Sequence, residues 1–324
     1  MNRKSNLIRF SFVLLFCLLA ACSGSTPTPA PQPLKVEWTT WQGDYTLLVA
    51  NAMGFFQQHG ISVEPVKYES ASQSIPDLAA GELDGGLYTM SDVLLASNLA
   101  DLKGVMVSDN GGVYSVVAST DIGTVRDLRG KRIGLNLHTA SEMFVSYMLK
   151  SESMNASNVE YVEVSPEQVP TSIPDTIDAG LVWEPYTSQA LQMGTRIVYQ
   201  SSKYSTLTPK MIVFRKSVVE QRPEDIRAFI QAWNDAVNYR LSHPQESLSI
   251  ISKATSLTPS ELKLAGEITI YTIDDNSRLF ADNPGTDASS IYFIARFNSD
   301  FLINIGYITN PPNIDELLDP SFLQ

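Results

Sequence analysis

The chain has 324 residues, of which 44% are hydrophobic, and it carries a formal net charge of −12. An acidic protein repels nucleic acid and anionic lipid headgroups, which disfavours a polyanionic partner. The two cysteines, Cys17 and Cys22, both lie close to the N-terminus. We therefore expect no disulfide, no metal site and no cofactor site built on cysteine in the rest of the chain.

Residues 1–21 have the composition of a signal peptide. Arg3, Lys4 and Arg9 lead into an apolar run over residues 10–21, which is shorter than the ~20 residues that a membrane-spanning helix needs. The run ends in Leu-Ala-Ala-Cys, which resembles the bacterial lipobox. This resemblance implies cleavage before Cys22, lipidation of Cys22 and an anchor on the extracytoplasmic face of the cell membrane. The alternative is an ordinary cleavage site with an incidental cysteine.

Residues 22–33 predict a flexible tether, because Pro, Ser and Thr dominate them after Cys22. Loss of the signal peptide removes three basic residues, which leaves 20 Lys and Arg against 35 Asp and Glu, a net charge of −15. Residues 34–324 are enough for two α/β lobes, each with its own core.

Short apolar runs alternate with helix-length periodic runs, which predicts two mostly parallel sheets flanked by helices. We expect strands at residues 34–39, 61–68, 84–88, 104–108, 113–118, 131–135, 159–164, 179–183 and 211–214. We expect helices at residues 45–59, 75–81, 92–100, 125–128 and 140–151, and a helical C-terminal region at 223–242, 244–254, 259–266 and 287–305. In the helix over 223–242, Trp233 belongs to an apolar stripe that is typical of a core-facing surface.

The pattern restarts after a glycine pair, Gly111 and Gly112, where a hinge is sterically permitted. We therefore predict lobe one from residues 34–112 and 208–324, and lobe two from residues 113–207. The chain would cross between the lobes near Asn110 and again near Thr208.

Four segments, at residues 50–56, 78–84, 125–134 and 178–186, resemble the solute-binding proteins that serve thiamine-pyrimidine, sulfonate, taurine and nitrate importers. The resemblance extends over roughly residues 34–255. It implies an α/β, two-lobe periplasmic-binding-protein fold, a monomer that is not an enzyme, and delivery of a small molecule to an ABC permease. It also implies a ligand between the lobes, which agrees with the general rule that open α/β sheets bind ligands at the carboxyl ends of their strands.

Segments that follow predicted strands supply the candidate ligand-binding residues. In lobe one these are Trp38, Thr39, Trp41, Gln42, Asp44, Tyr45, Tyr88, Thr89 and Asn110. In lobe two they are His138, Thr139, Ser141, Trp183, Glu184 and Tyr186. The aromatic rings would stack on a flat ligand, although core packing also explains Trp38 and Trp41.

The start of the predicted helix at residue 140 offers free backbone N–H groups. Glu184 would accept a hydrogen bond from the ligand, and its alternative is an ion pair with Arg196 or Lys210. The segments that supply these candidate ligand-binding residues contain no Lys or Arg, which disfavours a compact oxyanion as the ligand. The sequence thus ranks riboflavin first, a thiamine pyrimidine second, and sulfonates, taurine or nitrate third.

Two other classes of protein compete with an importer component. A related fold serves enzymes that make the thiamine pyrimidine, but those enzymes carry a cysteine-rich motif and a consumed histidine. The chain beyond residue 22 has no cysteine, and of His59, His138 and His243 only His138 lies near the predicted cleft. A lipoprotein that senses a solute is the second alternative, which the sequence does not separate from transport.

Overall fold

The computed structural model describes residues 32–111, 114–200, 208–264, 268–281, 283, 285–286 and 289–324. The predicted signal peptide, Cys22 and most of the tether lie outside the described residues. Within the described residues, no helix has both the length and the apolar composition to cross a membrane.

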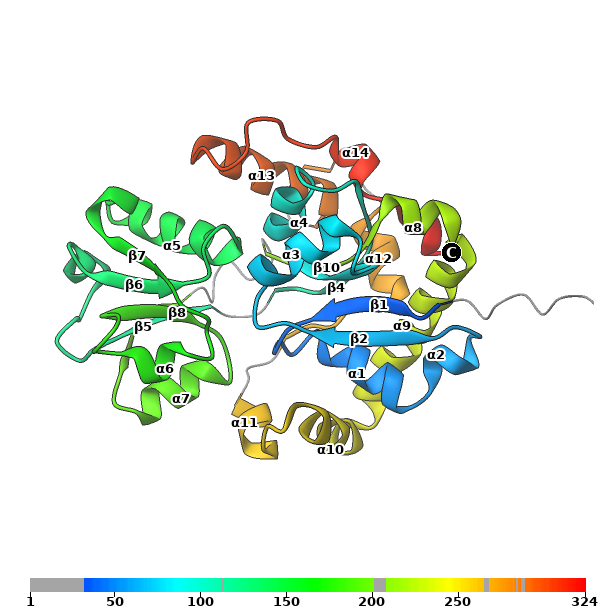
Figure 1. Ribbon diagram of the computed structural model, residues 1–324, viewed down its shortest axis with the longest axis horizontal. Coiled ribbons are helices and arrows are strands. Elements are labelled where there is room, and N and C mark those ends of the chain that lie inside the picture. Colours follow the sequence, from blue (N-terminus) through cyan, green and yellow to red (C-terminus); the bar gives the residue numbers. More distant parts are fainter. Residues whose placement is uncertain are drawn as a thin grey trace, which may run out of the picture. The chain divides into compact units, whose positions relative to one another are not determined.

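The first sheet has five strands in the order β2-β1-β3-β10-β4 (Figure 1). Their bounds are β1 Leu34–Trp38, β2 Val63–Lys67, β3 Gly85–Thr89, β4 Leu102–Asp109 and β10 Lys210–Arg215. β1 pairs in parallel with β2 and β3, whereas β10 runs antiparallel to both of its neighbours. The amino-terminal end of β10 therefore lies at the same sheet edge as the carboxyl ends of the other strands.

The second sheet repeats this plan in the order β7-β6-β8-β5-β9. Its strands are β5 Ser115–Ala118, β6 Arg132–Leu135, β7 Glu160–Glu163, β8 Ala179–Val182 and β9 Arg196–Gln200. Here β5 is the reversed strand, antiparallel to β8 and β9. The α/β fold class is thus confirmed, with one reversed strand in each otherwise parallel sheet.

Helices cover both faces of each sheet (Figure 1). Around the first sheet these are α1 Tyr45–Ala52, α2 Phe55–Gln58, α3 Ala71–Ala80 and α4 Met90–Ala96. Around the second they are α5 Ala140–Ser151, α6 Val169–Ser172 and α7 Tyr186–Gln192, with short 3₁₀ turns at Val125–Leu128 and Ala156–Asn158. One predicted helix, over residues 45–59, is two helices, because Gly54 adopts a left-handed φ of 72° between them.

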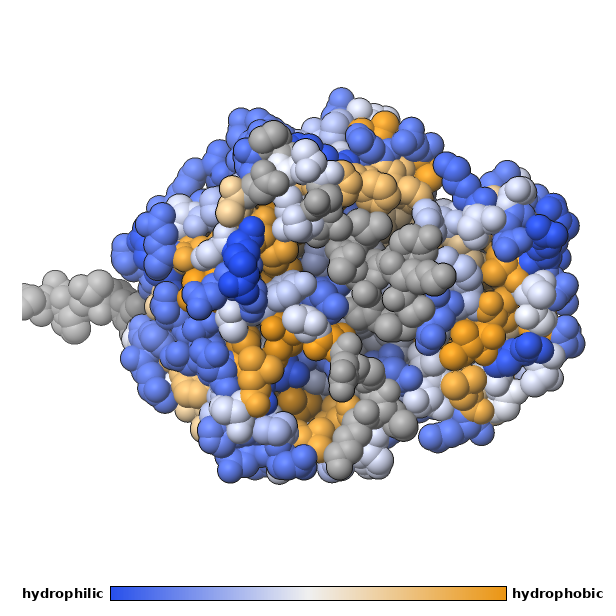
Figure 2. All heavy atoms as spheres, turned by 180° about the vertical axis from the view of Figure 1, so that it is seen from behind, coloured by the Kyte–Doolittle hydropathy of each residue, from blue (hydrophilic) through white to orange (hydrophobic). Residues whose placement is uncertain are grey.

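The carboxyl-terminal third is helical and packs on the first sheet. It comprises α8 Lys216–Gln221, α9 Pro223–Ser242, α10 Pro244–Thr255, α11 Pro259–Leu264, α12 Ile273–Leu279, α13 Ile291–Asn304, α14 Ile314–Leu317 and a final turn at Pro320–Phe322. Trp233 of α9 is fully buried beside Phe229, as its place in the apolar stripe predicts. The surface seen in Figure 2 is mostly hydrophilic, with hydrophobic residues in separate groups.

The chain passes from the first sheet to the second between β4 and β5, and returns between β9 and β10. Gly111 belongs to the first passage, and its φ is 87°. A Cβ atom on Gly111 would lie 1.9 Å from the carbonyl oxygen of Thr208, so these two residues lie side by side. The lobe boundaries at residues 112–113 and 207–208 remain our proposal, since Gly112, Val113 and Leu207 lie outside the described residues.

Candidate ligand-binding site

The candidate site is a cavity of about 440 Å³, partly open to solvent, where residues of the first and second sheets meet. Its lining comprises Thr39, Trp41, Ser70, Ala71, Leu87, Thr89, Asp92, Tyr114, Asn136, Thr139, Ala140, Ser141, Trp183 and Lys210. Most of these residues follow a parallel strand, and Tyr114 and Lys210 stand at the beginnings of the two reversed strands. The fold thus brings the carboxyl ends of the parallel strands and the amino-terminal ends of the reversed strands together at the cavity.

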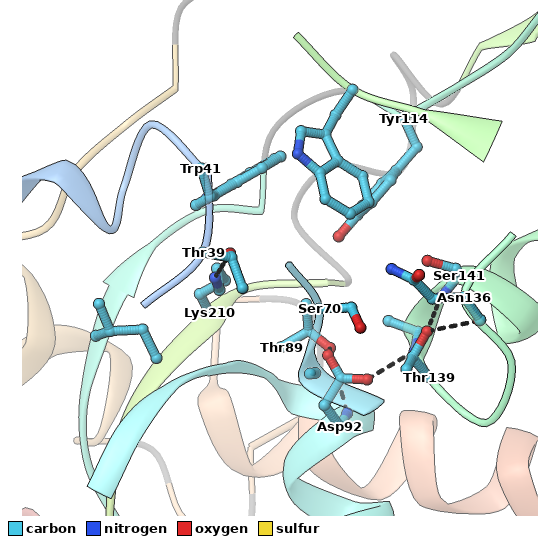
Figure 3. Close-up of a pocket in the computed structure, with 14 residues that line it drawn as sticks. Thr39, Trp41, Ser70, Thr89, Asp92, Tyr114, Asn136, Thr139, Ser141 and Lys210 are labelled. Carbon is cyan, nitrogen blue, oxygen red and sulfur yellow. Dashed lines mark hydrogen bonds between the residues drawn. The ribbon is translucent and has the colours of Figure 1, made fainter. Parts of the chain in front are cut away.

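Three aromatic rings form one side of the cavity (Figure 3). Trp41 stacks on Tyr114 with ring centroids 6.0 Å apart. Trp183 meets both rings edge-on, at 5.9 Å from Trp41 and 5.7 Å from Tyr114. Trp41 is held in place by a hydrogen bond from Nε1 to Asp109 at 3.2 Å, and Trp183 by one from Nε1 to the Thr40 carbonyl at 3.0 Å. These rings offer an apolar surface to a ligand.

The opposite side of the cavity is polar, and Asp92 is its buried carboxylate (Figure 3). Asp92 Oδ2 accepts a hydrogen bond from Thr89 Oγ1 at 2.6 Å, and Oδ1 accepts one from the backbone N–H of Ala140 at 2.7 Å. Thr89 and Asp92 form the amino-terminal cap of α4, while Ala140 is the first residue of α5. Burial raises the pKa of Asp92 above its ordinary value.

Asn136 supplies an unused acceptor beside Asp92. Its side chain is 3% exposed, and its Oδ1 has no hydrogen-bond partner in the protein. A buried carbonyl oxygen without a donor costs about 1–3 kcal/mol. Because Asn136 lines the cavity, a ligand that brings an N–H or O–H group would remove this cost.

Lys210 is the cation of the site, and it is already paired. Its Nζ lies 2.7 Å from Oδ2 of Asp44, which is fully buried. Burial opposes the charge of Lys210, but the carboxylates of Asp44 and Glu37 outweigh burial and raise the pKa of Lys210. Burial also raises the pKa of Asp44 to about 6, while Lys210 opposes this shift. A ligand anion therefore meets a neutralised lysine rather than a free positive charge.

Six of the predicted site residues line this cavity: Thr39, Trp41, Thr89, Thr139, Ser141 and Trp183. Their contact with a ligand stays a prediction. The argument that the site lacks Lys and Arg needs correction, because Lys210 reaches the cavity from the start of β10. Lys210 was not considered as a lining residue because the candidate residues came only from segments that follow strands.

Other predicted residues of the first lobe do not line the cavity. Trp38 is buried in the core beneath Lys67, whose Nζ lies 5.9 Å from the ring centroid. Asp44 pairs with Lys210, as described above. Tyr45 is 2% exposed and belongs to the same core. Gln42 Nε2 donates to the carbonyl of Leu262 at 3.4 Å.

Tyr88 and Asn110 also form hydrogen bonds with other residues of the protein and do not line the cavity. The hydroxyl of Tyr88 donates to Ser74 Oγ at 3.2 Å, and the residue is 1% exposed. Asn110 pairs with Thr269 through its backbone N–H and its Oδ1, each at 3.1 Å. Both residues stand at strand ends, but their side chains are already satisfied by the protein.

In the second lobe, His138, Glu184 and Tyr186 also lie outside the cavity lining. The side chain of His138 is 84% exposed. Glu184 Oε2 accepts from the backbone N–H of Ser188 at 3.1 Å, in the first turn of α7, and forms neither of the ion pairs considered for it. Tyr186 donates its hydroxyl to Glu167 Oε1 at 2.6 Å.

Several lining residues were not predicted from the sequence. Ser70 follows β2, so the rule used for the other parallel strands would have found it. Tyr114 precedes β5 and Lys210 begins β10, two strands whose reversal no local pattern reveals. Asp92 reads locally as a helix-capping residue, which it also is.

Comparison with known proteins identifies the family. The NMT1/THI5-like family profile matches residues 44–247, more than half of the chain, so the chain belongs to this family. A Bacillus subtilis (strain 168) protein named for binding aliphatic sulfonates is 24% identical over 257 residues, covering 76% of this chain and 77% of that protein.

Two further relatives have different names. The taurine-binding periplasmic protein of Escherichia coli (strain K12) is 24% identical over 196 residues, covering 59% of this chain and 61% of that protein. A Haemophilus influenzae (strain ATCC 51907 / DSM 11121 / KW20 / Rd) protein named for thiamine biosynthesis is 23% identical over 266 residues, covering 78% of this chain and 80% of that protein.

Solved structures show the same fold. The alkanesulfonate-binding protein of Xanthomonas axonopodis pv. citri, solved with bound MOPS, superposes with a TM-score of 0.73 at 14% identity and covers 90% of this chain and 99% of that one. The periplasmic nitrate-binding protein of Synechocystis PCC 6803 gives a TM-score of 0.71 at 14% identity, with coverage of 90% and 88%. The periplasmic-binding-protein fold is therefore shown.

Proposed function

We propose that this protein is the extracytoplasmic solute-binding component of an ABC importer, and that it captures a small sulfonate in the cavity between its sheets. The family, the fold and the names of the relatives support this function. Anchoring through Cys22 would keep the protein beside its permease. Sulfonates, ranked third from the sequence, now take first place, since no relative reported above is named for riboflavin.

The cavity can accommodate both ends of an alkanesulfonate. The side chains of Ser70 and Ser141 face it with hydroxyl groups, the kind of donor that sulfonate oxygens need, whereas the hydroxyl of Thr139 already donates to the Asn136 carbonyl at 2.9 Å. The rings of Trp41, Tyr114 and Trp183 offer an apolar surface for the carbon chain. The α/β scaffold positions the hydroxyl groups and the rings on opposite sides of the same space.

The observation that carries the proposal furthest is the pair Asp92 and Asn136. Both oxygens of the buried Asp92 carboxylate already accept hydrogen bonds, whereas Asn136 Oδ1 accepts none, so a ligand donor would satisfy Asn136 and an ammonium charge would be attracted to Asp92. A plain anion supplies none, and it would face the negative charge of Asp92. A zwitterion that joins an ammonium group to a sulfonate supplies both a donor and a positive charge, and taurine is a small compound of this kind. We infer that the ammonium group binds at Asp92 and Asn136.

A thiamine pyrimidine is the second candidate, and the aromatic cluster favours it. A flat ring would stack on Trp41 or Tyr114, and its amino group would satisfy Asn136. The relative named for thiamine biosynthesis is consistent with this ligand. The first-ranked riboflavin shares the flat ring and would be tested beside it.

We propose a binding function rather than catalysis. The relatives named above for sulfonate and taurine are named as binding proteins. A lipoprotein that senses a solute would use the same cavity. Binding to an ABC permease would distinguish transport from sensing.

A thermal-shift screen of the purified protein tests the proposal. The compounds are taurine, ethanesulfonate, nitrate, 4-amino-5-hydroxymethyl-2-methylpyrimidine and riboflavin. We expect the largest rise in Tm with taurine. A rise with the pyrimidine only would transfer the proposal to the second candidate, and no rise with any compound would contradict both.

A further inference from the structure

We propose a second ligand site, for a short aliphatic carboxylate, in a separate cavity formed by α9, α10, α11 and the residues that lead into α1. Its lining is Gln42, Tyr45, Arg240, Pro244, Ser247, Leu248, Ile251 and Leu262. The cavity has a volume of about 480 Å³, partly open to solvent, and shares no lining residue with the site described above.

Arg240 gives this cavity a cation without a carboxylate partner. Its Nη1 donates to the carbonyl of Gln42 at 3.1 Å and to Thr46 Oγ1 at 2.6 Å. Within the described part of the chain, no Asp or Glu oxygen lies within 4.0 Å of Arg240, and its Nε and Nη2 have no partner. Arg132, Arg215 and Arg222, which are also partly buried, each pair with an Asp.

The charge of Arg240 persists in this setting. Burial lowers its pKa to about 10, against the opposing effect of Asp109, so the guanidinium is protonated at neutral pH. A partly buried guanidinium with unused donors favours a bidentate acceptor, and a carboxylate is the matching group.

Ser247 provides a second, independent observation. The residue is 3% exposed, and its hydroxyl has no hydrogen-bond partner in the protein. Buried hydroxyl groups are normally paired, so an unpaired one that lines a cavity indicates a missing acceptor or donor. A carboxylate held by Arg240 would accept the hydrogen bond of Ser247.

The remaining lining residues determine the kind of anion. Pro244, Leu248, Ile251 and Leu262 contribute aliphatic surface. Inorganic phosphate would leave this surface exposed to water, whereas the methylene groups of a short fatty acid would cover it and remove it from water. The combination of one guanidinium, one hydroxyl and an aliphatic wall is therefore suited to a monocarboxylate such as butyrate.

Titration with butyrate, acetate and inorganic phosphate, followed by NMR chemical shifts of the full-length protein, tests this site. We expect butyrate to bind more tightly than acetate or phosphate. Arg240→Gln should weaken butyrate binding at least tenfold. Arg227→Gln, which removes an exposed arginine from the same helix, is the matched control and should bind like the parent.

Ser247→Ala keeps the test decisive if Arg240→Gln fails to fold, because it removes a hydroxyl that makes no bond in the protein. We expect weaker butyrate binding with an unchanged Tm. Equal binding of butyrate to the parent and Ser247→Ala, or equal shifts with phosphate and butyrate, would overturn the proposal and identify an adventitious ion only.

Discussion

The carboxylate of Asp92 lies 2.7 Å from the backbone nitrogen of Ala140, which links the start of α4 to the start of α5 across the cavity. The amino terminus of a helix favours negative charge, so Asp92 already occupies the position at α5 that a ligand anion would prefer. An anionic ligand group must therefore bind elsewhere in the cavity or displace this carboxylate. This contact is the reason why we assign the ammonium end of the ligand, rather than the sulfonate, to Asp92.

The aromatic side of the cavity is tested with Trp41→Ala. Loss of this ring should weaken ligand binding by the lost burial plus about 0.5–1.5 kcal/mol of stacking energy. Trp233→Ala is the contrasting variant, because Trp233 is fully buried in the core. It should lower the free energy of unfolding by ~3–5 kcal/mol. Calorimetric titration and denaturant unfolding measure the two effects, and unchanged affinity in Trp41→Ala would argue against a ligand at these rings.

The buried pair of Lys210 and Asp44 predicts a loss of stability that a second mutation partly restores. Lys210→Met leaves the carboxylate of Asp44 buried without its cation, which costs ~3–5 kcal/mol when one partner of such a pair is removed. The double variant Asp44→Asn with Lys210→Met removes both charges of the pair and should regain part of this loss, because the buried Glu37 and Asp109 still lose the same cation. Urea unfolding of the single and double variants measures the recovery, and additive losses would contradict the pairing.

Glu37 predicts a specific dependence of stability on pH. Burial raises its pKa from 4.5 to about 8, so the folded protein binds a proton that the unfolded chain releases between these values. Stability contributed by this group must therefore fall as pH rises from 4.5 to 8, by about 1.4 kcal/mol for each pH unit. Glu37→Gln should flatten the fall in Tm between pH 5 and pH 8. An unchanged pH profile would show that Glu37 ionises normally.

Membrane anchoring depends on Cys22, which lies outside the described residues. We expect Cys22→Ala to appear in the soluble fraction or to remain unprocessed. Fractionation of cells that express each form, with an antibody against the folded part, gives the answer. Equal membrane association of the parent and the variant would contradict lipidation.

The fold was largely predictable because strand and helix periodicities are local properties of the sequence. The direction of β5 and β10 was not, since the same apolar run fits either orientation in a sheet. Their reversal brings Tyr114 and Lys210 to the cavity, and these residues were therefore missed.

Side-chain satisfaction was the second limit of the sequence analysis. A carboxylate after a strand suggests a ligand contact, and Glu184 was chosen for that reason. Its Oε2 accepts from the backbone N–H of Ser188, which only the three-dimensional arrangement reveals, and its contact with a ligand stays a prediction. The unused acceptor belongs to Asn136, whose position after β6 resembles that of its neighbours in every local respect.

The central claim is tested most directly by calorimetric titration with two sulfonates that differ only in the amine, taurine and ethanesulfonate. The parent and Asp300→Asn, which changes an exposed acid on α13, should both bind taurine at least tenfold more tightly than ethanesulfonate. Asp92→Asn should lose this preference, because the ammonium group no longer meets a carboxylate. Equal affinity of the parent for both sulfonates, or a preference that survives in Asp92→Asn, would contradict the assignment of the ammonium group to Asp92.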